Sequence, residues 1–132
     1  MNMIANKSIV LIGGAGFIGH NLALTLKKAG ARVTIIDSLH VNSLLSFASS
    51  NYDEENRDLY YRIINQRLDL LREAEIPINV QDARDYNVLC RLLTEINPEV
   101  IIHLAAVAHA NKSNKDPYST FDHSSRTLEN VL

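Results

Sequence analysis

The glycine spacing between residues 8 and 37 constrains the fold of this chain more than any other feature. A short, uncharged and β-branched run, Ser8–Ile12, comes first and predicts a strand buried on both faces, as in parallel sheets. Three glycines follow it, at Gly13, Gly16 and Gly19. Gly13 permits a sharp turn into a helix, Gly16 lets a phosphate approach the backbone, and Gly19 lets the helix pack closely on the strand.

The segments after the glycines supply the context that such a triplet needs. Spacing predicts a helix over 17–29 with Gly30 as its stop, then a strand over 32–36. Asp37 ends that strand, 18 positions after the last of the three glycines, where a carboxylate can accept hydrogen bonds from an adenosine ribose. Free N–H groups near 15–18 are expected to point at the pyrophosphate of a dinucleotide. We favour this interpretation over a turn that binds nothing, because all these requirements occur in order.

Composition limits the other possibilities. The chain has 132 residues, enough for one domain. Its 13 basic residues are scattered along the sequence, and its net charge is −2. No basic stripe indicates nucleic acid or a membrane surface. The single cysteine, Cys90, excludes an internal disulfide, and its helical pattern favours a core residue over a reactive thiol. With no apolar segment of signal-peptide or membrane-spanning length, a cytoplasmic protein is expected.

Two long segments separate the second strand from the third. Residues 38–53 are rich in serine and asparagine and predict a loop that could reach the adenosine end of a ligand or a neighbouring subunit. Residues 54–75 repeat apolar side chains at helical spacing and predict an amphipathic helix. The arginines of this helix, Arg57, Arg62 and Arg67, are interpreted as part of its solvated face rather than as a nucleotide-binding surface.

The remaining segments complete an alternating pattern. A third strand is predicted over 78–80, a helix over 86–96 capped by Asp85, and a fourth strand over 99–104. Strand and helix thus alternate four times, which predicts an α/β fold with a doubly wound, Rossmann-type parallel sheet in the order 3-2-1-4. The glycine turn then lies at the switch point of the sheet, where ligands bind.

The chain closes on a helix that begins at Asp116-Pro117 and runs to Leu132. Since no stop signal follows, we expect the chain to end before a fifth strand, which leaves the edge of the fourth strand and one face of this helix exposed. Self-association through that edge or helix is therefore predicted. Ala105 and Ala106, after the fourth strand, suit either a flat ligand or tight helix–sheet packing.

A set of motifs in order points to a known family. The motifs are Gly13-Gly14-Ala15-Gly16-Phe17-Ile18-Gly19, Asp37-Ser38, Asp82-Ala83-Arg84-Asp85, His103-Leu104-Ala105-Ala106 and the helix over 116–132. With them the chain resembles, over nearly its whole length, the NAD-dependent nucleotide-sugar epimerases and dehydratases of the extended short-chain dehydrogenase/reductase superfamily. The resemblance implies that 1–132 is an incomplete NAD-binding domain of an enzyme that transfers a hydride to and from a sugar carbon.

The resemblance also implies cofactor-binding roles for individual residues. The pyrophosphate would lie on Gly13, Gly16, Phe17 and Ile18 with Gly19 completing the turn, the ribose on Asp37 beside Ser38, the adenine on Asp82 and Ala83, and the path to the nicotinamide along Leu104, Ala105 and Ala106. The charge of Asp37 would repel a 2′-phosphate and so favour NAD over NADP.

This chain departs from the family pattern in several places. The family's catalytic tyrosine precedes a lysine by four positions, and none of the five tyrosines does so here, so no catalytic residue is assigned. His123 and Arg126 stand where the family usually has asparagine and glycine, which predicts unusual packing of the last helix. The long segment between the second and third strands implies an added helix. A stand-alone, non-catalytic dinucleotide-binding module and a generic reductase are the alternative functions.

Five histidines do not change this interpretation. Their spacing matches no local metal-binding motif. His103 lies within the fourth strand and is interpreted as a hydrogen-bonded structural residue. His109, in the polar loop after that strand, could approach the nicotinamide or the substrate, which we state as a hypothesis.

Overall fold

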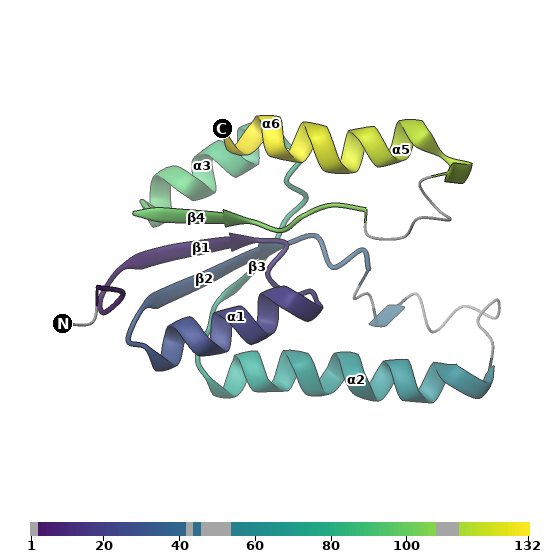
Figure 1. Cartoon of the computed structure of the whole chain (residues 1–132), viewed down its shortest axis with the longest axis horizontal. Coiled ribbons are helices and arrows are strands. Elements are labelled where there is room, and N and C mark those ends of the chain that lie inside the picture. Colours follow the sequence, from purple (N-terminus) through teal and green to yellow (C-terminus); the bar gives the residue numbers. More distant parts are fainter. Residues whose placement is uncertain (1–2, 42–43, 46–53, 108–113) are drawn as a thin grey trace.

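The computed structural model describes residues 3–41, 44–45, 54–107 and 114–132. Its elements, in chain order, are β1 (Ser8–Ile12), α1 (Phe17–Lys28), β2 (Arg32–Asp37), α2 (Glu54–Glu73), β3 (Ile78–Val80), α3 (Tyr86–Ile96), β4 (Val100–His103), α5 (Pro117–Phe121), the π-helical turn η2 (Asp122–Arg126) and α6 (Thr127–Val131). Figure 1 shows the sheet between two layers of helices.

The strands form one parallel sheet in the order β3-β2-β1-β4. Pairing runs from Ser8 opposite Arg32 to Ile12 opposite Ile36 on one side of β1, and Ile12 lies opposite His103 on the other side. The predicted fold class and strand order are therefore confirmed. All carboxyl ends of the strands meet at one edge, which is where open parallel sheets bind ligands.

Each face of the sheet has its own hydrophobic core. On one face, alternate residues of β1 and β2, such as Leu11 and Ile35, pack with residues of α1 and α2 that include Leu26 and Leu71. On the other face, residues such as Ile12 pack with α3 and α6. The central strand β1 is buried on both faces because helices cover both, so it carries no charged side chain.

Most predicted boundaries agree with the structure to within two residues, and caps explain where helices begin and end. Asp85 accepts the Val88 N–H at 3.2 Å, as its predicted capping role requires. The helix α2 ends at Glu73 rather than Glu75, because Glu75 has a left-handed backbone conformation with φ of 54°. The strand β4 is shorter than the predicted range 99–104.

The last helix differs from the continuous helix that the sequence predicted. It is α-helical over 117–121, widens into η2 over 122–126, and becomes α-helical again over 127–131. Both residues that depart from the family pattern, His123 and Arg126, lie within this π-helical turn. Turns of this kind are rare and often occur at functional sites.

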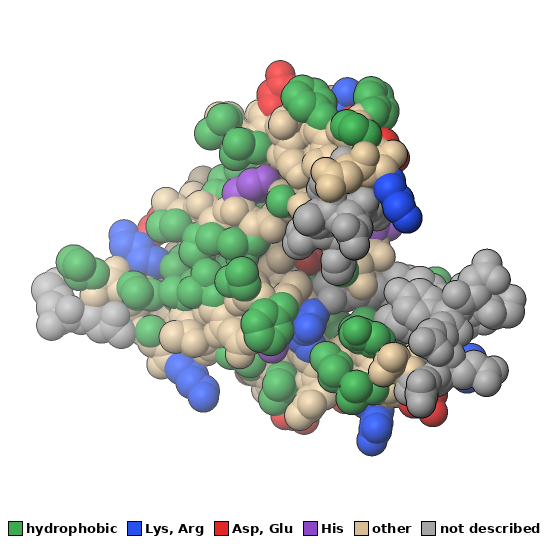
Figure 2. All heavy atoms as spheres, turned by 45° about the vertical axis from the view of Figure 1, so that its right-hand side comes forward, with side chains coloured by type: hydrophobic (Ala, Val, Ile, Leu, Met, Phe, Trp, Pro, Cys, Tyr) green, Lys and Arg blue, Asp and Glu red, His purple; other side chains and the backbone are tan. Residues whose placement is uncertain are grey.

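The β4 side of the molecule exposes apolar side chains, as the sequence predicted. Val100 and Ile101 of β4 are about two-fifths exposed, and Phe121 and Leu128 of the last helix are 63% and 44% exposed. Figure 2 shows apolar side chains on one face, in a group at the level of the sheet and another at the top, where α5 and α6 lie. Within the described residues, β4 pairs with β1 alone.

Candidate functional site

The glycine turn connects β1 to α1 and touches the end of β4. Gly13 has a φ of 78°, which favours glycine, and a Cβ at this position would lie 2.7 Å from the Ala105 nitrogen. The Gly13 N–H donates to the Ile36 carbonyl at 2.8 Å. The structure thus brings Gly13, predicted to bind the pyrophosphate, into direct contact with Ala105, predicted to line the path to the nicotinamide.

Two further glycines pack the turn against its surroundings. A Cβ on Gly19 would lie 2.6 Å from the backbone of Gly14, so α1 approaches the turn that follows β1 very closely at this position. A Cβ on Gly14 would lie 2.8 Å from the side chains of Leu11 and Ile35. The sequence analysis assigned Gly14 no packing role.

The start of α1 is open toward the edge of the sheet. Gly16 is the N-cap, and a Cβ there would meet only the Gly13 oxygen, at an ordinary 3.5 Å. The first turn of α1 closes with the His20 N–H donating to the Gly16 carbonyl at 3.1 Å, so the N–H groups of Phe17 and Ile18 precede the intrahelical bonds. Both side chains are exposed, at 74% and 66%. This arrangement suits an anionic group at the helix N-terminus.

Asp37 lies beside this turn and is fixed by two backbone groups. Its Oδ2 accepts the Ala15 N–H at 2.9 Å, and its Oδ1 accepts the Leu39 N–H at 2.8 Å. The prediction that the Ala15 N–H points at the ligand is therefore wrong, because the neighbouring carboxylate takes that donor. Each carboxylate oxygen keeps a further lone pair for a ribose hydroxyl.

Arg67 reaches the same turn from α2. Its Nη1 donates to the Ala15 carbonyl at 3.3 Å, and its side chain is partly buried, so the prediction of a solvated position is wrong. Burial lowers the pKa of the Arg67 guanidinium, and the nearby Asp37 carboxylate opposes that shift. A signal was present in the sequence, since Arg67 is three positions after the buried Ile64 and four before the buried Leu71.

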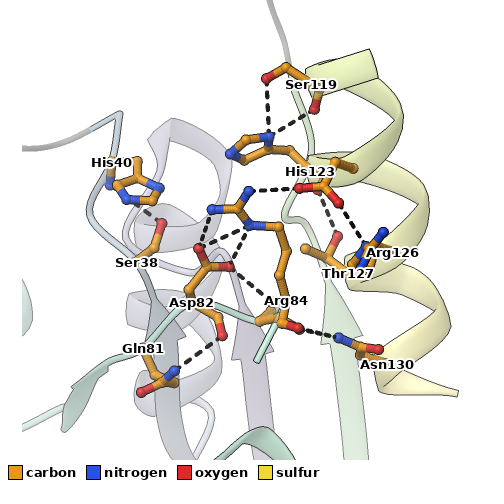
Figure 3. Close-up of polar contacts among 12 residues, drawn as sticks. Ser38, His40, Gln81, Asp82, Arg84, Ser119, His123, Arg126, Thr127 and Asn130 are labelled. Atoms are coloured by element: carbon orange, nitrogen blue, oxygen red, sulfur yellow. Dashed lines mark hydrogen bonds and ion pairs between the residues drawn. The ribbon is translucent and has the colours of Figure 1, made fainter. Parts of the chain in front are cut away.

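A charged cluster joins the end of β3 to the last helix (Figure 3). Arg84 donates through Nε and Nη2 to Asp82, with the shortest contact at 2.6 Å, and through Nη1 to Asp122 at 2.7 Å. Arg126 also contacts Asp122, at 2.7 Å. Hydrogen bonds from Arg84 lower the pKa of the Asp82 and Asp122 carboxyl groups, and the two carboxylates raise the pKa of Arg84. Arg84 therefore occupies much of the Asp82 carboxylate that was predicted to contact adenine.

Two histidines lie next to this cluster. The rings of His40 and His123 are 6.3 Å apart between centroids and meet edge to face. His123 Nδ1 is 2.8 Å from the Ser119 carbonyl, and the His40 N–H donates to the Ser38 hydroxyl at 3.4 Å. The start of the segment after Asp37, predicted to be a loop that could reach the adenosine end of a ligand or a neighbouring subunit, therefore faces the π-helical turn.

The residues after β3 and β4 are held by the last helix. Asn130 donates to the Ala83 and Arg84 carbonyls at 2.9 and 3.0 Å, and the Ala83 side chain is buried in the core. Thr127 Oγ1 is 3.4 Å from both His103 Nε2 and the Ala105 carbonyl. Burial lowers the pKa of His103, in agreement with its predicted structural role. Leu104 is partly buried and Ala106 is exposed.

Other candidate features lie apart from this site or outside the described residues. His109 and part of the loop over 38–53 fall outside the described residues. Among the residues that the structure describes, no group of three or more potential ligands could hold a metal ion. None of the described helices has the length and apolar character to cross a membrane. A hollow of about 540 Å³ is lined by residues of α2 and by none of the predicted cofactor-binding residues.

Several curated relatives of the chain are named as UDP-sugar 4-epimerases. It is 30% identical over 116 residues to UDP-glucose 4-epimerase of Neisseria meningitidis serogroup A, which covers 88% of this chain and 29% of that protein. It is 28% identical over 109 residues to UDP-arabinose 4-epimerase 1 of Arabidopsis thaliana, covering 83% of this chain and 22% of the relative. The chain thus spans less than a third of the length of these relatives.

Solved structures show the same fold. UDP-glucose-4-epimerase from Stenotrophomonas maltophila, with bound NAD and formylated UDP-arabinopyranose, superposes with a TM-score of 0.67 at 24% identity, over 96% of this chain and 32% of that one. L-threonine dehydrogenase from Clostridium difficile superposes with a TM-score of 0.62 at 17% identity, over 96% and 32% of the two chains. Similarity at this level of identity shows the fold alone.

The family model gives the broader assignment. The model described as the NAD dependent epimerase/dehydratase family matches residues 9–132, which includes the glycine turn, Asp37, the charged cluster and the last helix. The resemblance noted from the sequence motifs is confirmed by this match, as is NAD as the cofactor of the family. The chain belongs to the NAD-dependent epimerase/dehydratase family.

Proposed function

We propose that this chain is the NAD-binding portion of a nucleotide-sugar epimerase or dehydratase. The observation that carries the proposal is the Asp37 carboxylate fixed by the Ala15 N–H beside the open start of α1. That pairing supplies a ribose acceptor and a pyrophosphate site within one turn of chain. The relatives that act on UDP-sugars support a nucleotide-sugar substrate.

The residues present fit NAD. Backbone N–H groups of Phe17 and Ile18 would bind the pyrophosphate, and open space next to Gly16 leaves room for it. Asp37 would accept the ribose hydroxyls, and Ala105 would line the nicotinamide end. Because Arg84 binds the Asp82 carboxylate, we propose that the adenine contacts depend on the backbone near Ala83. NAD would accept a hydride from a sugar carbon and return it, a chemistry that belongs to the cofactor.

Cofactor choice tests the proposal directly. Titration calorimetry with NAD and NADP should show NAD binding at least about tenfold more tightly, because Asp37 repels a 2′-phosphate. The variant Asp37→Asn removes that repulsion and should reduce the difference between the affinities for NAD and NADP. Equal affinities of the unchanged protein for NAD and NADP would contradict the ribose assignment.

A non-catalytic dinucleotide-binding module is the second candidate. It is compatible with the observation that none of the five tyrosines is followed by a lysine four positions later. Both functions predict NAD binding and no epimerisation by these residues alone. Activity assays on any natural form that continues past Leu132 separate them, since turnover supports the enzyme and inactivity supports the module. The single cysteine suits a reducing compartment, and we retain a cytoplasmic location as part of the proposal.

We also propose self-association through the exposed β4 edge or the last helix. The exposed side chains of Val100, Ile101, Phe121 and Leu128 provide an apolar surface for it. Light scattering should give a molecular mass that rises with protein concentration. A mass equal to that of one chain at every concentration would contradict self-association.

A further inference from the structure

Arg67 contacts the glycine turn across 52 positions of sequence. We propose that Arg67 is a positioning residue of the cofactor site, which fixes the peptide between Ala15 and Gly16 and moderates the rejection of a 2′-phosphate by Asp37. The inference rests on the proposed NAD-binding function and adds to it a residue outside the strand–turn–helix unit. Arg67 lies outside all the sequence motifs on which the family resemblance rests.

The first argument is the way in which Ala15 is held. Its N–H donates to Asp37 at 2.9 Å, and its carbonyl accepts from Arg67 at 3.3 Å. Since Ala15 is completely buried, neither group can exchange its partner for water. The two contacts therefore fix the backbone on both sides of Ala15, directly before the N-cap Gly16 from which the pyrophosphate-binding N–H groups begin.

The second argument is charge. Arg67 and Asp37 bind the same residue from opposite sides, so a cation and an anion both lie near the ribose end of the site. The negative charge of Asp37 raises the pKa of Arg67 against the lowering by burial, which agrees with this proximity. A 2′-phosphate would be repelled by Asp37 and attracted by Arg67. Without Arg67 only the repulsion remains.

The third argument is that the other described arginines of α2 do not share this arrangement. Arg72 pairs with Asp69 at 2.8 Å on the surface, Arg57 lies 3.9 Å from Asp58, and Arg62 is exposed. Figure 1 shows α2 running beside α1 and beyond the carboxyl edge of the sheet. The added helix therefore contributes to the site as well as to the core.

Binding measurements on matched variants test the inference. Calorimetric titration of the chain with NAD and NADP should show that Arg67→Met weakens NAD binding about tenfold, the effect expected for one lost charge-assisted hydrogen bond. NADP binding should weaken by roughly a further threefold or more, so that preference for NAD rises. Arg67→Lys restores the charge and should return the preference to the original ratio. Arg62→Met, which removes an exposed arginine of the same helix, should change neither affinity.

A purely structural role of Arg67 would weaken the binding of both dinucleotides by the same factor. An unchanged ratio of NAD to NADP affinity in folded Arg67→Met would therefore overturn the inference. The proposed function would still stand if the unchanged protein binds NAD. Circular dichroism confirms folding. If Arg67→Met does not fold, Arg67→Gln takes its place, and an unchanged ratio there also overturns the inference. Failure of the unchanged protein to bind NAD would overturn the proposed function and the inference with it.

Discussion

The glycine turn and the charged cluster lie at the same edge of the sheet but are built from different interactions. The turn depends on backbone contacts, with Gly13 against Ala105 and Gly19 against Gly14. The cluster depends on side-chain charges, with Arg84 between two carboxylates. Backbone contacts at van der Waals distance allow almost no substitution, whereas partly exposed ionic contacts can be exchanged at lower cost. Under the proposed function, the turn would fix where the cofactor binds, and the cluster would be where its surroundings can be adjusted.

Burial follows the same division. The strand next to the turn, β1, is buried along its whole length, while β4, which precedes the last helix, has exposed residues at its start. Stability should therefore depend most on the turn and its strand, and least on polar contacts near β4. The following substitutions test that order.

The largest effect is expected from Gly13→Ala. A Cβ at Gly13 would meet the backbone of Ala105 at 2.7 Å, and the φ of 78° is strained for alanine, so we expect a loss of about 4 kcal/mol in the free energy of unfolding. Urea denaturation measures it. The matched control, Gly16→Ala, has room for its Cβ and should change stability by less than about 1 kcal/mol. Similar losses for both glycines would refute the steric explanation.

A smaller effect is expected in the charged cluster. Arg84→Met removes the partner of both Asp82 and Asp122, and should cost about 1–2 kcal/mol because the group is partly exposed to solvent. The exposed Arg91 on α3 is the control, and Arg91→Met should cost less than about 0.5 kcal/mol. A loss after Arg84→Met as large as that of Gly13→Ala would remove the distinction between the two regions.

Acid should act through His103. Burial holds its pKa in the folded state below the ordinary value of 6.5, so below that pH the unfolded chain binds more protons and stability falls as pH decreases. We expect the free energy of unfolding to fall between pH 7 and 5, and to change less over that range in His103→Gln. The Asp82 carboxyl titrates in a separate, lower window, since its lowered pKa gives stability that is lost only in stronger acid. Identical pH profiles for the two proteins would contradict the assignment to His103.

The smallest effect is expected where β1 and β4 begin. Lys7 and Glu99 form a surface ion pair at 2.9 Å, with both side chains about half exposed. Lys7→Met should cost no more than about 0.5 kcal/mol, and the difference should vanish in roughly 1 M salt, where such pairs are screened. Thermal unfolding at low and high salt measures both. A cost that persists in high salt would show that packing rather than charge is lost.

Local patterns in the sequence determine much of this structure. The strand order and the helix caps follow from alternation and from single capping residues such as Asp85. The position of Asp37 next to the turn also follows, because both lie at the ends of adjacent strands. These features depend on residues that are close in sequence or on the general rules of parallel sheets.

Contacts between distant segments could not be read in this way. The helical spacing of Arg67 from Ile64 and Leu71 could indicate a position near the core, but only the tertiary structure shows that it reaches Ala15. The pairing of Arg84 with Asp122 similarly spans 38 positions. The Ala15 N–H was assigned to a ligand because its competitor, Asp37, is 22 positions away. In each case the choice between two partners depends on tertiary distances that spacing does not encode.

The π-helical turn η2 determines the direction in which the side chains of the following helix α6 point. A helix advances about 100° per residue, so one additional residue in a turn rotates the following segment by that angle. Asn130 reaches the Ala83 carbonyl only in the present phase. Deleting one residue from 122–126 would restore a regular helix and point Asn130 away from the β3–α3 connection. The irregular turn thus aligns the end of the chain with the connection between β3 and α3.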